Sequence, residues 1–317
     1  MNQSLSPLGM MQQLFADAKP HLKILLLFIF MGISSIIMVF IGTLLAIPLF
    51  SLSYDSIQEI LNEGFRDAPV GLIRYFQAFQ TAGMFIFPAL LGSSMLLHKE
   101  EGLFRSRRNN YILLIGLLII VLITAVPFVQ FLISLNENIR FPEGMSGLKD
   151  RLTNMETERQ LLSEKMLSES QAWNIFMNFL IIAIIPSIGE EFLFRGVMQK
   201  LFQAWIGNIH IAIILAAAIF SAFHLQFFGF LPRMVLGVFF GYLFVWSGSI
   251  WPAVLAHFLN NSLALTVIYL SGHQVFRDIT LQEGTGSGTN LLVIASMILT
   301  AGFIFLIRRI LMKSFKD

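Results

Sequence analysis

Two adjacent carboxylates, one arginine, two histidines and one asparagine lie in strongly apolar stretches of this sequence, and their chemistry needs an explanation. These six residues are Glu190, Glu191, Arg195, His224, His257 and Asn261. An ionisable side chain inside a lipid-spanning helix costs at least about 2.5–3.5 kcal/mol, so such residues are typically functional. Their concentration between residues 190 and 261 therefore predicts one polar site to which three helices contribute.

The acidic pair and the arginine lie on one predicted helix. Glu191 and Arg195 are four residues apart with the acid first, which is the favourable order for an ion pair on a helix. Glu190 lies about 100° around the helix from Glu191, so we do not expect it to share Arg195 equally. We therefore expect Arg195 to neutralise Glu191 and Glu190 to act as a general base. A purely structural tie between helices is compatible with the same pairing.

The histidines lie on two further predicted helices, each with a partner one helical turn away. His257 and Asn261 are four residues apart, and Phe220 and His224 repeat that spacing. These residue types suit the attack of water on a carbonyl group. Glu190 with His224 would hold and deprotonate the water, and His257 with Asn261 would donate hydrogen bonds to the oxyanion.

The same side chains permit a second interpretation as metal ligands. Glu190, His224 and His257 match a catalytic zinc set with one open position. The histidines lie on separate helices and not in a single His-Glu-x-x-His helix, so the spacing does not decide between zinc and a site without metal. The chain has no cysteine, which excludes disulfides, iron–sulfur clusters, thiolate zinc sites and a cysteine nucleophile.

The composition shows what surrounds these residues. Of 317 residues, 56% are hydrophobic and 13% are charged, whereas a soluble domain has about 25% charged residues. The mean hydropathy is +0.75. These values exclude a soluble enzyme, a disordered chain and a collagen-like fibre. They predict that the lipid bilayer itself is a partner of the protein. A net charge of +2 is too balanced to predict a nucleic-acid partner.

The expected fold class is all-α: one integral-membrane domain over residues 1–317, built as a polytopic bundle of about eight spans. A bilayer core needs about 20 apolar residues in helix, and unpaired backbone groups are too costly in lipid for other structures. The apolar runs are 24–50, 75–97, 111–134, 173–204, 209–228, 231–247, 250–271 and 290–311. Gly207 with Asn208, and Gly248, predict turns between runs.

Basic residues predict the orientation of these spans, because they are enriched on the cytoplasmic side. With both termini in the cytoplasm, the inner segments hold 12 basic and 6 acidic residues, and the outer segments hold 9 basic and 13 acidic ones. The inner basic residues are Lys19, Lys23, Lys99, Arg105, Arg107, Arg108, Arg195, Lys200, Arg308, Arg309, Lys313 and Lys316. We therefore predict that both termini are cytoplasmic.

One long connection, residues 135–172, is predicted on the outer face. Its apolar residues have near-helical spacing and predict one amphipathic helix outside the membrane; they are Leu148, Leu152, Met155, Leu162 and Met166. The helix would be a solvated connector that rests on the bundle, or alternatively a lid or partner-docking element.

Three short motifs, in order, resemble the signature of the CPBP intramembrane proteases. The sequence contains Glu190-Glu191-Phe-Leu-Phe-Arg195, then Phe220-Ser-Ala-Phe-His224, then His257-Phe-Leu-Asn260-Asn261. The family pattern is Glu-Glu-x-x-x-Arg, Phe-x-x-x-His and His-x-x-x-Asn. This family includes type II CAAX prenyl endopeptidases and Abi-like proteins that process bacteriocins or confer immunity. The resemblance covers the C-terminal half, with a catalytic core at about residues 173–271.

The resemblance implies an intramembrane endopeptidase whose cavity is reached from the cytoplasmic side. It implies that Glu190 activates water with His224 as its partner, that His257 and Asn261 contact the oxyanion or a metal, and that Glu191 and Arg195 support them. Family members have been described both as metalloproteases and as a glutamate type. The substrate would be a peptide or a membrane-anchored protein.

A bacterial inner membrane is the expected location, since the chain is cysteine-free, compact and basic on one side. The alternative function is a non-proteolytic membrane protein, either a scaffold or immunity protein or an ion or proton carrier. A carrier is expected to show paired repeats or broken helices in two halves, and the sequence shows neither.

Overall fold

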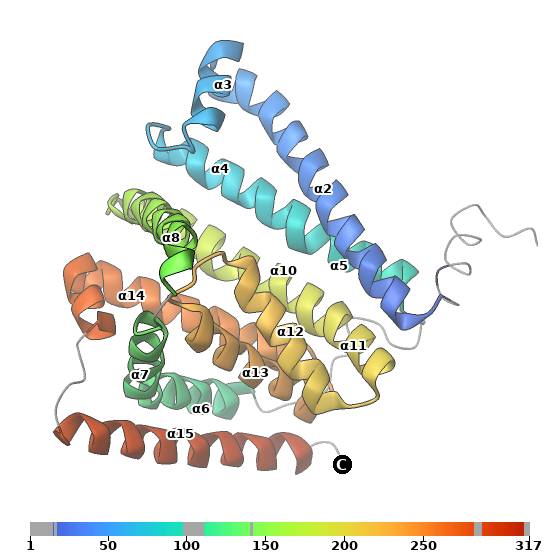
Figure 1. The fold of residues 1–317 in the computed structure, drawn as a ribbon, viewed down its shortest axis with the longest axis vertical. Coiled ribbons are helices and arrows are strands. Elements are labelled where there is room, and N and C mark those ends of the chain that lie inside the picture. The colour runs from blue at the N-terminus through green and yellow to red at the C-terminus, as the bar shows by residue number, and fades with distance from the viewer. Residues whose placement is uncertain (1–14, 16–17, 98–110, 140–141, 282–286, 314–317) are drawn as a thin grey trace, which may run out of the picture. The chain divides into compact units, whose positions relative to one another are not determined.

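The computed structural model describes residues 15, 18–97, 111–139, 142–281 and 287–313, and every regular element within them is a helix (Figure 1). The predicted all-α fold class is confirmed. The chain divides into two compact units: Met1–Arg105 with Ile184–Ala216, and Ser106–Ala183 with Ala217–Asp317. We call these unit 1 and unit 2. The single integral-membrane domain over residues 1–317 stays a prediction.

Unit 1 combines the N-terminal helices with a later segment that carries the acidic pair. Its helices are α2 (Pro20–Leu49), α3 (Tyr54–Asn62), α4 (Val70–Thr81), the π-helix η1 (Ala82–Ile86), α5 (Phe87–Met95), α10 (Ile185–Leu193), the π-helix η5 (Phe194–Met198) and α11 (Gln199–Ile206). α2 packs along α4, η1 and α5, and α10 packs against η1 (Figure 1).

Small residues let the backbones of unit 1 approach closely, as is usual where helices pack in a membrane. A methyl group on Gly83 in η1 would lie 2.8 Å from Met38 Cβ and 3.0 Å from the Ser34 carbonyl oxygen of α2. The Ser34 hydroxyl donates a 2.5 Å hydrogen bond to the Gly83 carbonyl oxygen. The hydroxyl of Tyr75 in α4 donates to the Gly42 carbonyl oxygen at 2.9 Å.

Unit 2 holds the two histidine motifs and the long connection. Its helices are α6 (Tyr111–Thr124), α7 (Val126–Glu137), the 3₁₀-helix η3 (Glu143–Met145), α8 (Ser146–Leu167), α9 (Ala172–Asn178), the π-helix η4 (Phe179–Ile184), α13 (Phe230–Ser247), α14 (Trp251–Leu281) and α15 (Ser287–Lys313). The unit boundary falls within α12 (Ile209–Phe223), and one residue before the end of η4. α14 is kinked at Gly272.

The core of unit 2 lies between α6, α13, α14 and α15. Leu118, Phe240, Leu243 and Ile307 are almost fully buried there, beside alanines of α14. The bend between α6 and α7 measures 46°, at a break that Pro127 follows. α15 satisfies the backbone groups freed at this bend, because the Ser296 hydroxyl donates to the Thr124 carbonyl oxygen at 2.6 Å and accepts from the Phe128 N–H at 3.2 Å.

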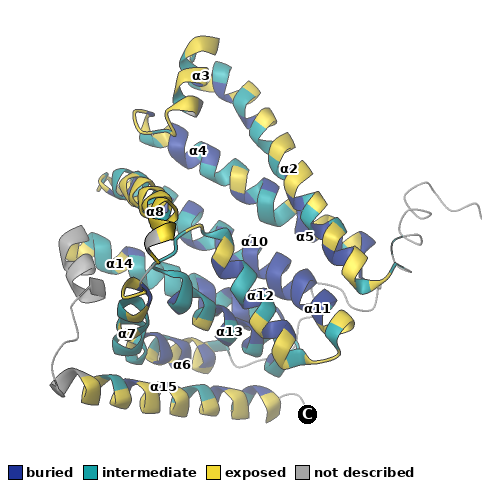
Figure 2. Ribbon diagram, in the orientation of Figure 1, coloured by how far each residue is buried: buried dark blue, intermediate teal, exposed yellow. Residues whose placement is uncertain are grey.

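The helices are those of an integral membrane protein. Five of the described helices are long and apolar enough to cross a bilayer: Pro20–Leu49, Ala172–Ile206, Phe230–Ser247, Trp251–Gly272 and Asn290–Lys313. The bent α6–α7 pair raises the count to six if it is one span. Figure 2 shows exposed residues along α2 and α15, and they include Ile36, Phe40, Ile298 and Phe305. Lipid stabilises such apolar surfaces, whereas water does not.

The predicted count of eight spans is not confirmed. The run 209–228 forms only the 15-residue helix α12, whose length of about 22 Å is less than the bilayer core needs. The run 75–97 forms parts of α4, η1 and α5, and it is not among the five helices that could cross a bilayer. Its first part contains the polar residues Gln77 and Gln80. Some charges used to predict the orientation lie outside the described residues: Lys99, Arg105, Arg107, Arg108 and Lys316.

The predicted turns and the predicted surface helix are both present. Gly207 and Gly248 end α11 and α13 in the left-handed conformation, at φ 75° and 61°. α8 is a helix as expected, but its amphipathic pattern is partly wrong, because Leu148 and Met155 are exposed. The half-buried face of α8 instead includes two charged residues, Glu156 and Arg159. Burial lowers the pKa of the Arg159 guanidinium.

Candidate active site

The acidic pair lies on α10, a nine-residue helix between two π-helical segments. Glu190 is 6% exposed and Glu191 is fully buried. η4 precedes α10 and η5 follows it directly. π-helical turns are rare and occur frequently at functional sites, because one extra residue per turn redirects side chains and frees backbone groups. The helix that carries the acidic pair is therefore flanked at both ends by departures from regular α-helix geometry.

Glu191 and Arg195 form the ion pair that their spacing predicts. Arg195 Nη1 lies 2.8 Å from Glu191 Oε1, and both side chains are almost completely buried. The Arg195 charge also interacts with Glu190. The predicted pairing of Arg195 with Glu191 is thus observed.

A glycine next to the acidic pair allows α10 to approach η1 closely. A methyl group on Gly189 would lie 2.8 Å from Cγ1 of Ile86 and 3.4 Å from Cβ of Phe85. The Phe85 ring in turn contacts the ring of Phe194, with centroids 6.0 Å apart. The backbone next to Glu190 is therefore in close contact with the neighbouring segment η1.

The first histidine motif ends α12. His224 Nδ1 lies 2.9 Å from the Phe220 carbonyl oxygen, one turn earlier. Because a carbonyl oxygen can only accept, Nδ1 carries the proton in this contact, and in the neutral ring Nε2 presents its lone pair. The contact therefore leaves His224 in the tautomer that a general base or a metal ligand requires.

Aromatic rings hold both histidines of unit 2. The Phe220 ring lies edge-on to His224 at 5.0 Å and edge-on to His257 at 5.8 Å, centroid to centroid. The His257 ring stacks on Phe240 of α13 at 5.2 Å with an interplanar angle of 20°, and it is only 4% exposed. The structure thus brings the two predicted histidines to the same phenylalanine. Phe240 was not predicted as a site residue.

Asn261 connects the second histidine motif to η4. Its Nδ2 donates to the Ile182 carbonyl oxygen at 3.1 Å, and its Oδ1 accepts from Asn260 Nδ2 at 3.1 Å. The acceptor belongs to a π-helical segment, in which backbone pairing is altered. One amide N–H of Asn261 therefore has a structural partner, and the amide's second N–H is the one available to an oxyanion. The neighbouring Asn260 supports Asn261 through this bond.

The six predicted residues fall in two compact units. Glu190, Glu191 and Arg195 belong to unit 1, and the His224, His257 and Asn261 motifs belong to unit 2. The predicted zinc set takes one ligand from unit 1 and two from unit 2, and its carboxylate and imidazoles are suitable zinc ligands by type. In the part of the chain that the structure describes, no three or more such side chains are arranged to hold a metal ion.

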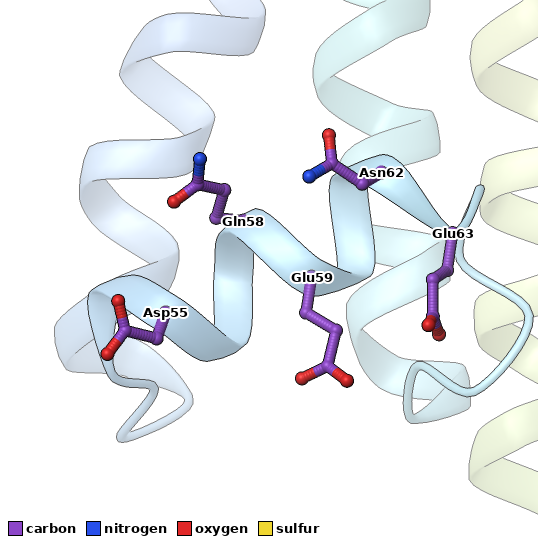
Figure 3. A pocket seen from close by; sticks show the side chains of 5 residues that line it. All are labelled: Asp55, Gln58, Glu59, Asn62 and Glu63. Atoms are coloured by element: carbon purple, nitrogen blue, oxygen red, sulfur yellow. The ribbon is translucent and has the colours of Figure 1, made fainter.

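A different polar surface lies on α3, where an open hollow is lined by one face of the helix. Figure 3 shows its residues, which are Asp55, Gln58, Glu59, Asn62 and Glu63. The three carboxylates follow one another at four-residue spacing. Binding sites are typically clefts lined mainly by apolar residues with a few polar groups, whereas only polar and charged residues line this hollow. It is a solvated helix face and not a second active site.

Several ionisable side chains are buried on helices that are long and apolar enough to span a membrane. In membrane proteins such residues are typical of functional sites. Residues 172–263 match the family model described as Rce1-like, type II CAAX prenyl endopeptidase Rce1-like. This part of the chain is therefore similar to that family, and the resemblance carried by the three motifs is confirmed. The match contains all six predicted site residues. Comparisons with curated proteins and with solved structures gave no match.

Proposed function

We propose that the protein is an intramembrane endopeptidase that hydrolyses peptide bonds of a peptide or a membrane-anchored protein. The observation that carries this proposal is the match of residues 172–263 to the endopeptidase family, in a region that also holds the buried motifs. Placing carboxylates and imidazoles inside lipid-spanning helices has a high free-energy cost, and this supports a chemical role for them. Prenyl groups belong to the family's name, and the chain's own features do not identify a prenylated substrate.

In this proposal Glu190 and His224 activate the water. A general base must lie within hydrogen-bond distance of the proton that it removes. Glu190 accepts the proton from water, and the Nε2 lone pair of His224 holds the same water by accepting its second hydrogen. The Nδ1 contact with the Phe220 carbonyl oxygen supports this role, because it leaves Nε2 as the acceptor.

The tetrahedral intermediate needs hydrogen-bond donors for its oxyanion. We assign this role to His257 and to the second amide N–H of Asn261. Donors held in fixed positions stabilise developing charge without reorganisation at the moment of reaction. Stacking of His257 on Phe240 and the bond from Asn261 to the Ile182 carbonyl oxygen both restrict these donors.

Glu191 and Arg195 complete the proposed site without touching the substrate. Their ion pair keeps the charge of one carboxylate balanced, so that the neighbouring Glu190 remains the reactive one. Arg195 also interacts with Glu190, which connects the supporting ion pair to the proposed base. A divalent metal held by Glu190, His224 and His257 remains a prediction, and the bacterial inner membrane remains the proposed location.

The test is Glu190→Gln in the purified full-length protein, with cleavage of a quenched fluorescent peptide as the readout. Loss of the base should lower kcat by roughly 10²–10⁴-fold, with unchanged elution and thermal unfolding. Glu59→Gln, an exposed carboxylate on α3, is the matched control and should cleave like the wild type. Wild-type cleavage by Glu190→Gln would show that another group is the base. A scaffold or carrier would show no cleavage in any variant.

A further inference from the structure

The five residues that follow His224 form a connection that is bound by side chains from three helices. This loop, residues 225–229, joins α12 to α13. Leu225 begins it in the left-handed conformation, at φ 51°, which is unfavourable for a residue other than glycine. A connection of this kind is normally mobile unless its backbone groups have partners. Here the backbone changes direction directly after the imidazole that the proposed reaction uses.

Polar side chains bind the loop along its length. Arg233 of α13 donates from Nη2 to the Gln226 carbonyl oxygen at 2.8 Å and from Nη1 to Gln226 Oε1 at 2.5 Å. The amide of Asn136 in α7 donates to the Phe227 carbonyl oxygen. Glu156 Oε2 of α8 accepts from the Phe228 N–H at 3.1 Å.

Two of these partners come from residues 135–172, the segment predicted to be a solvated connector or, alternatively, a lid or partner-docking element. Asn136 lies near the end of α7 and is almost fully buried, and Glu156 lies on the half-buried face of α8. The bond from the Glu156 carboxylate to the Phe228 N–H is charge-assisted, which makes it stronger than a bond between neutral groups. Close to the loop's other end, the Ser221 hydroxyl of α12 donates to the Phe230 carbonyl oxygen at 2.7 Å. All of these residues belong to unit 2.

We propose that Glu156 and Asn136 are positioning residues for His224, acting through the 225–229 loop. The imidazole is fixed on one side by its bond to the Phe220 carbonyl oxygen and on the other by a loop whose backbone cannot shift. Misplacement of a catalytic group by about 1 Å can cost 10²-fold in rate, so a loosened loop lowers kcat. The residue 135–172 connection is therefore part of the catalytic structure. This role in catalysis rests on the proposed function, whereas the anchoring of the loop does not.

The experiment compares three α8 variants of the full-length protein in detergent. Glu156→Ala removes the acceptor, Glu156→Gln keeps an oxygen acceptor without the charge, and Asp150→Ala removes an exposed carboxylate elsewhere on α8. Two quantities are measured for each variant: hydrogen–deuterium exchange of the peptide that contains residues 225–229, and the kcat and KM for a quenched fluorescent peptide.

In Glu156→Ala we expect faster exchange in the loop and a kcat lowered by about tenfold at unchanged KM, the scale of one lost bond to a charged group. Glu156→Gln should restore both quantities to within about twofold of the wild type, because its amide oxygen still accepts. Asp150→Ala should match the wild type. Unchanged exchange in Glu156→Ala overturns the anchoring, and faster exchange with wild-type kcat overturns the positioning role. Absence of cleavage by the wild type contradicts the proposed function and leaves the exchange result as the test of anchoring.

Discussion

At the scale of single residues, the buried Glu191–Arg195 pair is the most clearly defined feature of the site. Its 2.8 Å contact lies where both side chains are shielded from solvent and lipid. Taking two charges out of water is costly, so a pair of this kind contributes little net stability. If one partner is removed, however, the remaining buried charge has no compensating charge and destabilises the protein. The pair is thus better explained by a role beside Glu190 than by stability.

This explanation predicts non-additive effects of substitution. Arg195→Met leaves two buried carboxylates without their cation and should lower the free energy of unfolding by about 3–5 kcal/mol. Glu191→Leu combined with Arg195→Met should recover part of that loss but not all, because Glu190 also interacts with Arg195. Unfolding in mixed detergent micelles measures both variants. A double variant that is no more stable than Arg195→Met would contradict the coupling.

At the scale of elements, close backbone contact between helices positions the acidic motif. α10 packs on η1, and η1 packs on α2 through Gly83, whose Cα faces backbone atoms of the neighbouring helix. Backbone atoms cannot move aside as the end of a flexible side chain can. The position of Glu190 therefore depends on small residues in helices outside the matched region.

A pair of glycines provides the test of this packing. Gly83→Ala places a methyl group 2.8 Å from Met38 Cβ and 3.0 Å from backbone atoms of α2, and should destabilise the protein by about 1–3 kcal/mol. Gly32→Ala adds the same methyl group to α2 where nothing lies within 4 Å, and should be neutral or slightly stabilising. Thermal unfolding in detergent compares the two. Equal stabilities would show that the contact between α2 and η1 is looser than described.

At the scale of the whole molecule, two expectations from the sequence conflict. The charge distribution places residues 135–172 on the outer face, whereas the family resemblance implies a cavity reached from the cytoplasm. Within unit 2, Glu156 of α8 binds the loop that follows His224. The side of the membrane on which α8 lies is therefore also the side of this loop.

Single cysteines resolve the orientation, since the chain has no cysteine of its own. We predict that Asn154→Cys in α8 reacts with a membrane-impermeant maleimide in intact cells. His21→Cys and Lys313→Cys, near the two ends, should react only after permeabilisation. All three positions are exposed. If all three positions are protected in intact cells, α8 lies on the cytoplasmic side and the prediction for α8 is wrong. The 225–229 loop, which Glu156 binds, then also lies on the cytoplasmic side. Labelling of only one terminal position would indicate an odd number of spans.

The sequence by itself determined the fold class, the Glu191–Arg195 pair, the turns at Gly207 and Gly248 and the family resemblance of residues 172–263. Each of these follows from local information: apolar length, four-residue helical spacing, glycine conformation and short motifs. Only the tertiary structure showed that Phe220 also contacts His257, that Asn261 binds the Ile182 carbonyl oxygen and that Glu156 binds the loop after His224. These contacts join residues that are far apart in the chain, and helical periodicity specifies only neighbours within a few turns. Polar residues in apolar runs, such as Arg233, were the available signal, but their partners depend on packing.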